Sequence, residues 1–249
     1  MIPRIFHRIW MQGQPPPKYD DMAKSWKTLH PTWEIKTWTE DMLKPLADAE
    51  WKRVLSKCTL LIQRADVYRL ILLEIYGGVY IDCDMYTLKS LEPLMHDGRV
   101  QLGGCHGTIS SAFISVNNGI IIAPPKLTVW KTCVIPELLR AFSTQTILDA
   151  LVTVRVIRTT GPLVWARIVE RDPTKFLVHS PETFYSLRVK KRMPIESVRK
   201  TLTDSYVYHV QDSAWLGGWE RGVMVCLMNA KWILVLFLCV MFLRHWILS

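Results

Sequence analysis

The stretch of residues 59–86 constrains the fold more than any other part of this 249-residue chain. It begins with a run that is apolar on nearly every side, which predicts a helix buried on most of its surface. Gly77 and Gly78 end that helix, because glycine accepts the left-handed backbone that a helix terminus favours. The following Val79, Tyr80 and Ile81 have strand character. The stretch therefore predicts a buried helix that leads directly into a strand of an α/β core.

An acidic turn, Asp82-Cys83-Asp84, follows this strand directly. With the two-residue period of a strand, the carboxylates of Asp82 and Asp84 point to one side. Two carboxylates so close together repel each other unless a positive charge lies between them. A divalent cation with oxygen ligands meets that need. The alternative is a strand end with two solvated aspartates, and the pair alone favours this alternative because it often occurs by chance.

The preceding helix favours a cation site at the acidic turn over two solvated aspartates. Asp66 and Arg69 lie three residues apart and share one helix face. An ordinary intrahelical ion pair is the alternative interpretation. However, both charges lie in a helix that is otherwise almost wholly apolar, and buried charges need partners and often mark functional sites. We therefore expect Asp66 and Arg69 to belong to the same site as the acidic turn.

Together these residues form the pattern A-D-x-x-R followed by Y-G-G-x-Y-x-D-x-D. This pattern resembles the signature of the glycosyltransferases with a DXD-containing sugar-binding region. That family includes yeast outer-chain and inositol-phosphoceramide mannosyltransferases and, more distantly, the clostridial glucosylating toxins. The resemblance runs from residue 2 to about residue 215 and is strongest over residues 59–95. It implies a GT-A fold, which agrees with a Rossmann-like α/β sheet in which strands alternate with helices.

The resemblance also implies an activity. It is the transfer of a hexose from a nucleoside diphosphate sugar, a UDP- or GDP-sugar, to a hydroxyl of a glycan, lipid or protein, with retention of the anomeric configuration. Asp82 and Asp84 would hold the divalent metal, and Asp66 and Arg69 would hydrogen-bond the hydroxyls of the sugar. Tyr80 would lie beside the sugar nucleotide. The rival interpretation is a non-catalytic, membrane-attached module that only binds sugar nucleotides.

Trp10, in the segment I-W-M-Q-G, matches the family's aromatic residue that stacks on the nucleotide base. An ordinary core tryptophan is the alternative. Thr160-Gly161-Pro162 resembles the family's T-G-P segment, which begins a helix near the active site.

A second functional stretch spans residues 206–215 and resembles the family's closing H-x-x-x-S-W, with one residue inserted before Trp215. The match makes His209 a candidate third metal ligand and places Ser213 and Trp215 on the diphosphate. Asp212 is an alternative to His209 as the ligand, and a surface histidine without a ligand role is a further alternative. Imidazole beside carboxylates suits Mn²⁺ better than Mg²⁺.

The chain carries a formal charge of +9, with part of the basic excess clustered in residues 188–200. Such a cluster suits phosphate, nucleic acid or an anionic membrane. No basic motif interleaved with aromatic residues supports nucleic acid, so we expect no nucleic-acid partner. The six cysteines lack C-x-x-C spacing, which indicates buried or free thiols rather than zinc ligands or disulfides. Unpaired cysteines favour a reducing compartment.

The composition becomes strongly apolar after residue 222. Residues 223–243 reach the length of about 20 residues that a spanning helix needs, although Lys231 and Asn229 interrupt them. We expect residues 223–248 to be a hydrophobic helix that anchors a catalytic domain of residues 1–220 to a membrane. A helix that packs on the domain, or lies in the interface, is the alternative. No secretory signal is evident at the N-terminus, so the catalytic domain is expected on the cytosolic side.

Periodicity and breaker residues predict further elements along the chain. The expected strands are residues 2–10, 34–38, 100–102, 112–116 and 120–123; the expected helices are residues 17–29, 126–142 and 146–156. A turn is expected at Asn117-Asn118-Gly119, between two of these strands.

Overall fold

The computed structural model describes residues 1–105, 116–144, 149, 151–186 and 193–212. The chain divides into two compact units. The first combines Met1–Thr146 with Val156–Asp212, and the second combines Ile147–Arg155 with Ser213–Ser249. In the second unit the structure describes only residues 149 and 151–155, so the fold and the site below are those of the first unit.

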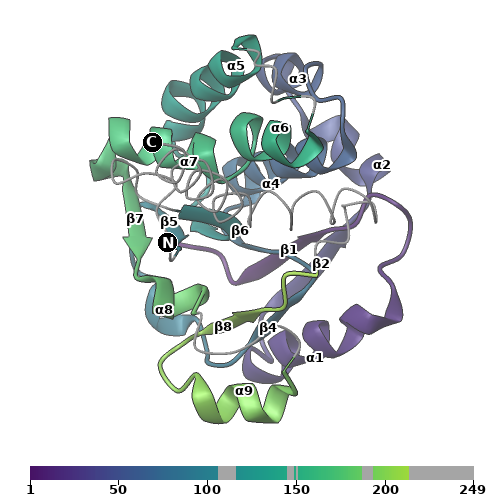
Figure 1. The fold of residues 1–249 in the computed structure, drawn as a ribbon, viewed down its shortest axis with the longest axis vertical. Helices are drawn as coiled ribbons and strands as arrows, with labels where there is room; N and C mark the ends of the chain where they lie inside the picture. The colour runs from purple at the N-terminus through teal and green to yellow at the C-terminus, as the bar shows by residue number, and fades with distance from the viewer. Residues whose placement is uncertain (106–115, 145–148, 150, 187–192, 213–249) are drawn as a thin grey trace, which may run out of the picture. The chain divides into compact units, whose positions relative to one another are not determined.

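A six-stranded sheet forms the centre of this unit (Figure 1). Its strands, in spatial order, are β2 (Glu34–Trp38), β1 (Ile5–Ile9), β3 (Gly78–Ile81), β6 (Val116–Ala123), β5 (Val100–Gly104) and β7 (Phe176–His179). The pairs β1–β2, β1–β3 and β5–β7 are parallel, whereas β6 runs antiparallel to both of its neighbours. The predicted α/β class is confirmed, with a sheet that is rich in parallel pairs but mixed because of β6.

The two faces of the sheet each support a hydrophobic core. Alternation along β3 places Tyr80 in one core and Val79 and Ile81 in the other. The first core is formed with helices α3 (Ala49–Leu55), α4 (Leu61–Tyr76), α5 (Ile135–Ser143) and α7 (Pro162–Arg171). The second includes residues of α1 (Asp20–Leu29) and α8 (Pro181–Phe184). Because β3 is fully buried between these cores, the segment that follows it is held in a defined place.

Smaller elements complete the unit. β4 (Met85–Thr87) and β8 (Val207–His209) form a separate two-stranded sheet. The remaining helices of this unit are α2 (Glu40–Leu43) and α9 (Ile195–Thr201), with short 3-10 turns at Pro17–Tyr19, Lys44–Leu46, Glu92–Leu94 and Pro173–Lys175. Helix α6 (Val152–Thr159) begins in the second unit and ends in the first.

The glycine pair makes the predicted junction between α4 and β3. Gly77 and Gly78 have φ of +64° and +95°, a region that favours glycine. A Cβ at Gly77 would lie 2.6 Å from the ring of Pro125, and one at Gly78 would lie 2.6 Å from the side chain of Ile5. Both glycines are therefore required by conformation and by space.

His7 on β1 braces the same junction from the neighbouring strand. Its Nε2 lies 2.8 Å from the carbonyl oxygen of Gly77, and its Nδ1 accepts a hydrogen bond of 3.0 Å from the indole N–H of Trp38. Because Nδ1 accepts, the ring proton is on Nε2, which donates to Gly77. Burial lowers the pKa of His7 to about 4. The imidazole is therefore neutral at pH 7.

Several of the expected elements differ in the structure. Asn117, Asn118 and Gly119 do not form a turn but lie inside β6, where the pairing with β5 shifts register between Leu102 and Gly103. The side chain of Asn117 accepts a hydrogen bond of 2.8 Å from the backbone N–H of Gly119. This local hydrogen bond is typical of a turn, but here it forms within β6, next to the register shift.

The helix expected over residues 126–142 begins later, with a π-helical segment at Trp130–Val134 before α5. Lys126 has a φ of +61°, which is incompatible with a helix starting there. The helix expected over residues 146–156 appears as Val152–Thr159, and residues 145–148 and 150 lie outside the described part of the chain, as do residues 112–115 of an expected strand.

Within the described ranges, no helix combines the length and the apolar character needed to cross a membrane. The apolar stretch of residues 223–248 lies outside these ranges.

Candidate functional site

The acidic turn lies where β3 ends, and two backbone contacts hold it. The N–H of Asp82 donates to the carbonyl oxygen of Gly119 on β6 at 2.8 Å. On the other side, the N–H of Val210 donates to the carbonyl oxygen of Asp84 at 3.0 Å. Residues 83 and 84 form a turn rather than a continuation of the strand, so the turn, and not strand alternation, brings the two carboxylates together.

The pairing of β4 with β8 adds His209 to this turn. Met85 lies opposite His209 in the antiparallel register, directly after Asp84. One ligand atom from each of Asp82, Asp84 and His209 lies within 4.8 Å of the others. The three side chains predicted as metal ligands therefore converge in space, although 125 residues separate Asp84 from His209.

The two carboxylates differ electrostatically. Burial acts to raise the pKa of Asp84, but the charge and hydrogen bond of His209 and the N–H of Asp212 outweigh it and hold the pKa below its usual value. At Asp82, burial raises the pKa and the nearby Asp84 adds to this, against the opposing charge of Arg69. Asp84 is therefore ionised, and a further cation between the two would stabilise the ionised form of Asp82.

Asp212, the alternative candidate for the third metal ligand, contacts Asp84 through its backbone rather than through its carboxylate. Its N–H donates to Oδ2 of Asp84 at 2.8 Å, and its own carboxylate accepts from Tyr19 Oη at 2.8 Å and from Lys18 Nζ. The carboxylate thus has two donors of its own, and His209 rather than Asp212 completes the group with Asp82 and Asp84.

A buried ion pair lies beside the turn. Asp66 and Arg69 on α4 are 4% and 3% exposed, and Arg69 Nη2 lies 2.7 Å from Asp66 Oδ1. Arg69 Nη1 donates to the carbonyl oxygen of Asn118 and lies 3.5 Å from Asp82 Oδ1. The guanidinium lies over the ring of Tyr80, 4.3 Å from its centroid, and Tyr80 Oη donates to Asp82 Oδ1 at 2.9 Å. Arg69 therefore links α4 to the acidic turn, and its buried Nε has no partner within the described structure.

Asp66 receives further hydrogen bonds from residues distant in sequence. Thr160 Oγ1 donates to Oδ2 at 2.7 Å, and Asn118 Nδ2 donates to Oδ1 at 3.3 Å. Burial raises the pKa of Asp66 to about 6, even though Arg69 and these donors act in the opposite direction. Thr160 belongs to the T-G-P segment, and Gly161 is the N-cap of α7, as that segment predicted. The hydrogen bond between Thr160 and Asp66 could not be predicted from the sequence, because 94 residues separate the two.

Gly119 is a further site residue that sequence reasoning missed. A Cβ at this position would lie 2.7 Å from Asp82 Oδ2 and 2.8 Å from Met85 Cε. The missing side chain therefore leaves the space that the carboxylate of Asp82 occupies. The only sequence signal was the N-N-G triplet, which is typical of a turn.

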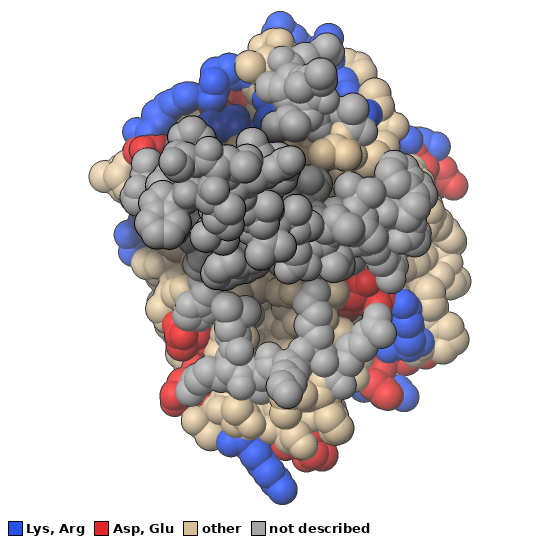
Figure 2. All heavy atoms as spheres, in the orientation of Figure 1, with Lys and Arg blue, Asp and Glu red and all other residues tan. Residues whose placement is uncertain are grey.

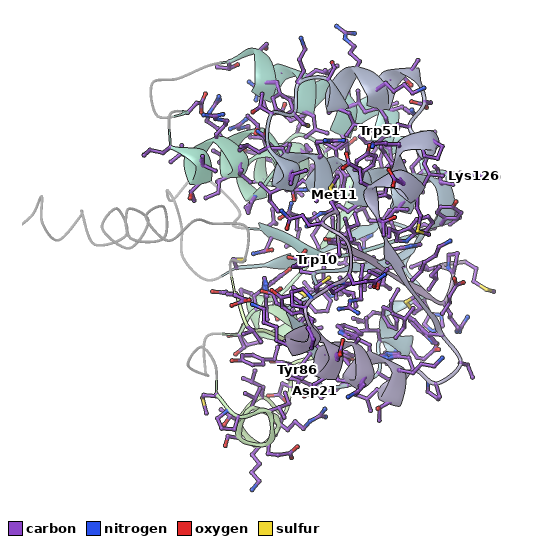
Figure 3. All side chains as sticks on the ribbon, turned by 90° about the vertical axis from the view of Figure 1, so that its right-hand side faces the viewer. Trp10, Met11, Asp21, Trp51, Tyr86 and Lys126 are labelled. Atoms are coloured by element: carbon purple, nitrogen blue, oxygen red, sulfur yellow. The ribbon has the colours of Figure 1, made fainter. Side chains whose placement is uncertain are left out.

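Trp10, labelled in Figure 3, directly follows β1 and is only half-buried, unlike the core tryptophans. Its ring centroid lies 5.4 Å from that of Tyr19, whose hydroxyl donates to Asp212. Trp10 is thus connected to the acidic turn through Tyr19 and Asp212. Ser213 and Trp215 lie outside the described residues.

Comparison with known proteins agrees with the motifs. Residues 16–101 match the family model described as a glycosyltransferase sugar-binding region containing a DXD motif. Residues 16–101 are therefore similar to the DXD-containing region of these glycosyltransferases. The range contains Asp66, Arg69, Asp82 and Asp84, whereas Trp10 and His209 lie outside it.

Similar proteins occur in yeasts and in a giant virus. Inositol phosphoceramide mannosyltransferase 3 of Schizosaccharomyces pombe is 34% identical over 98 residues, which cover 38% of this chain and 28% of that protein. Mannosyl phosphorylinositol ceramide synthase SUR1 of Saccharomyces cerevisiae is 31% identical over 98 residues, which cover 38% of this chain and 26% of that protein. The match thus spans less than a third of the length of these yeast proteins. The uncharacterized glycosyltransferase L373 of Acanthamoeba polyphaga mimivirus is 24% identical over 232 residues, which cover 86% of this chain and 84% of that protein.

Among solved structures, the ligand-free glycosyltransferase domain of the YGT toxin has a TM-score of 0.48 at 8% identity, over 72% of this chain and 80% of that one. Galactosyltransferase LgtC in complex with donor and acceptor sugar analogues has a TM-score of 0.44 at 14% identity, over 85% of this chain and 88% of that one.

Proposed function

We propose that this chain is a metal-dependent, retaining glycosyltransferase of the GT-A type. It moves a hexose from a UDP- or GDP-sugar to a hydroxyl of a glycan, lipid or protein. The observation that carries the proposal is the convergence of Asp82, Asp84 and His209 beside the buried Asp66–Arg69 pair. The yeast relatives named as inositol phosphoceramide mannosyltransferases support a hexose as the transferred group.

The donor set fits a divalent cation. Two carboxylates and an imidazole offer ligand atoms within 4.8 Å of one another, and Gly119 leaves room for Asp82 Oδ2. A mixed oxygen and nitrogen set favours Mn²⁺ over Mg²⁺. When bound there, such a cation supplies the positive charge that stabilises a departing diphosphate.

The surrounding side chains hold this set in place. Arg69 fixes Asp82 from α4, and Tyr80 donates to the same oxygen of Asp82. Asp66 in turn orients Arg69 and is itself held by Thr160. Preorganised donors and acceptors of this kind orient a substrate without reorganisation during the reaction. We assign the sugar hydroxyls to Asp66 and Arg69, and the buried Nε of Arg69 offers an unused donor.

The remaining contacts of the donor follow from the family resemblance. Trp10 would stack on the base, and Ser213 and Trp215 would contact the diphosphate. The partial exposure of Trp10 and its connection to Asp212 through Tyr19 support its assignment. We further propose that residues 1–220 form the catalytic domain and that residues 223–248 attach it to a membrane, with the catalytic domain on the cytosolic side.

A panel of UDP- and GDP-sugars, incubated with and without Mn²⁺, tests the proposed activity. We expect slow release of nucleoside diphosphate from one donor, dependent on Mn²⁺. Nucleotide binding without any release would instead indicate a non-catalytic binding module. A protein that binds no nucleoside diphosphate in Mn²⁺ would contradict both.

A further inference from the structure

Helices α5 and α7 hold one buried carboxylate among three arginines. This Glu137 cluster consists of Glu137, Arg140, Arg167 and Arg171. Glu137 is fully buried, at 0% exposure. Arg140 donates to both of its oxygens, through Nε at 2.8 Å and Nη2 at 2.6 Å. Arg171 donates at 3.0 Å and Arg167 at 3.4 Å, from positions one helical turn apart on α7.

The cluster carries an excess of positive charge. Burial acts to raise the pKa of Glu137, but the hydrogen bonds and charges of the arginines outweigh it and hold the pKa below its usual value. The carboxylate is therefore ionised and contributes one negative charge against three positive ones. Within the described structure, Glu137 is the only hydrogen-bond partner of all three guanidinium groups. Two positive charges remain uncompensated in the cluster.

Arg140 alone already forms a bidentate pair with both oxygens of Glu137 and neutralises its charge. Arg167 and Arg171 add repulsion among like charges, so stability of the helix pair does not by itself account for them. The side chains of Arg140 and Arg171 are 50% and 55% exposed. About half of each of these two side chains is therefore accessible from solvent. Figure 2 shows blue side chains gathered over the part of the molecule where Figure 1 places α5.

We propose that the Glu137 cluster binds a phosphate group. Guanidinium groups match the geometry of phosphate oxygens and form charge-assisted hydrogen bonds with them. A phosphate dianion would also balance the two excess charges. The phosphate comes either from a lipid headgroup or from a soluble phosphate compound.

This site lies apart from the acidic turn. α7 begins next to Thr160, which contacts Asp66, and ends at Arg171. A helix of 10 residues is about 15 Å long, so Arg171 is at the far end of α7 from Thr160. The inference does not rest on the proposed transferase activity, and an enzymatically inactive protein would still show it.

The test uses the full-length chain and two probes. Inorganic phosphate is titrated at constant ionic strength, with chloride as the balancing anion, and binding is followed calorimetrically. In parallel, flotation compares vesicles of phosphatidylcholine alone with vesicles that also contain phosphatidic acid. The neutral vesicles measure any attachment by the apolar C-terminal residues, so the difference between the two vesicle types reports the headgroup.

The variants are Arg140→Gln, Arg171→Gln and the double substitution. Arg4→Gln is the matched control, because Arg4 is 44% exposed and forms a two-pronged pair with one carboxylate, that of Glu92. We expect the double variant to lose at least tenfold in affinity for one or both probes, while Arg4→Gln retains it. Melting temperatures verify that each variant is folded.

A loss confined to vesicles with phosphatidic acid assigns the phosphate to a lipid, and a loss confined to inorganic phosphate assigns it to a solute. The proposal is overturned if the wild type binds neither probe, if chloride replaces phosphate equally well, or if Arg4→Gln weakens binding as much as the double variant does.

Discussion

Gly119→Ala is the sharpest test of the candidate site, because it adds one methyl group next to a single carboxylate oxygen. The new Cβ would lie 2.7 Å from Asp82 Oδ2 and 2.8 Å from Met85 Cε. Gly119 is not among the glycines with positive φ, so alanine fits its backbone without strain. The substitution therefore introduces a steric clash without straining the backbone.

Its magnitude follows from the distances. An ordinary contact begins near 3.4 Å, so the carboxylate must withdraw from 2.7 Å by about 0.7 Å, or Gly119 must shift by a similar amount. Metal–ligand distances tolerate only about 0.2 Å, and catalytic geometry only about 0.5 Å. We therefore expect loss of Asp82 as a ligand and a fall in turnover of roughly tenfold to a thousandfold. Overpacking should lower the free energy of unfolding by about 1–3 kcal/mol, towards the low end because the side chain of Asp82 is 27% exposed and can move.

The assay measures Mn²⁺ affinity by calorimetry and Mn²⁺-dependent donor hydrolysis, together with the melting temperature. Gly98→Ala is the matched control, since a Cβ there meets nothing within 4 Å and its φ is not positive. The control should resemble wild type in all three measurements. If Gly119→Ala binds Mn²⁺ and hydrolyses donor as the control does, Asp82 does not hold a metal in the position described above.

Four further predictions address other parts of the chain. Asp84→Asn should reduce transfer and hydrolysis by roughly a thousandfold or more with the circular dichroism spectrum unchanged, and near-normal turnover in Mn²⁺ would contradict its ligand role. Arg69→Ala should impair donor hydrolysis more than binding of free nucleoside diphosphate; an equal loss of both would remove its assignment to the sugar. The pKa of His7 is about 4 in the folded state and about 6.5 in the unfolded state, so protonation of His7 favours the unfolded state. In urea denaturation, the free energy of unfolding should be constant above pH 6.5 and fall by up to about 3 kcal/mol towards pH 4. His7→Gln should flatten that decline, and a decline of the same size in the variant would exclude His7 as its cause. Truncation after Gly222 should release a protein from carbonate-washed membranes that still hydrolyses donor, with protease protection of the full-length chain reporting sidedness; a full-length protein found in the soluble fraction would refute attachment.

Local chemistry was readable from the sequence. The spacing of Asp66 and Arg69 places them on one helix face, and glycines end that helix at the predicted place, because both effects depend on neighbours a few residues apart. The strand Glu34–Trp38 has the expected bounds for the same reason. The acidic pair could also be identified by sequence alone, although a turn rather than a strand brings its carboxylates together.

Only the tertiary structure decided which distant residues complete the site. His209 rather than Asp212 lies with the two aspartates because of the register between β4 and β8. Strand pairing and packing set this register, and the spacing of residues in the sequence does not predict it. Likewise, the N-N-G triplet forms a turn-like hydrogen bond, but its place in the middle of the sheet makes it part of β6 and puts Gly119 against Asp82. The three arginines around Glu137 come from two helices, and their excess charge becomes evident only where α5 packs on α7. Contacts of this kind depend on the free energy of the whole fold, whereas sequence patterns report the preferences of each segment by itself.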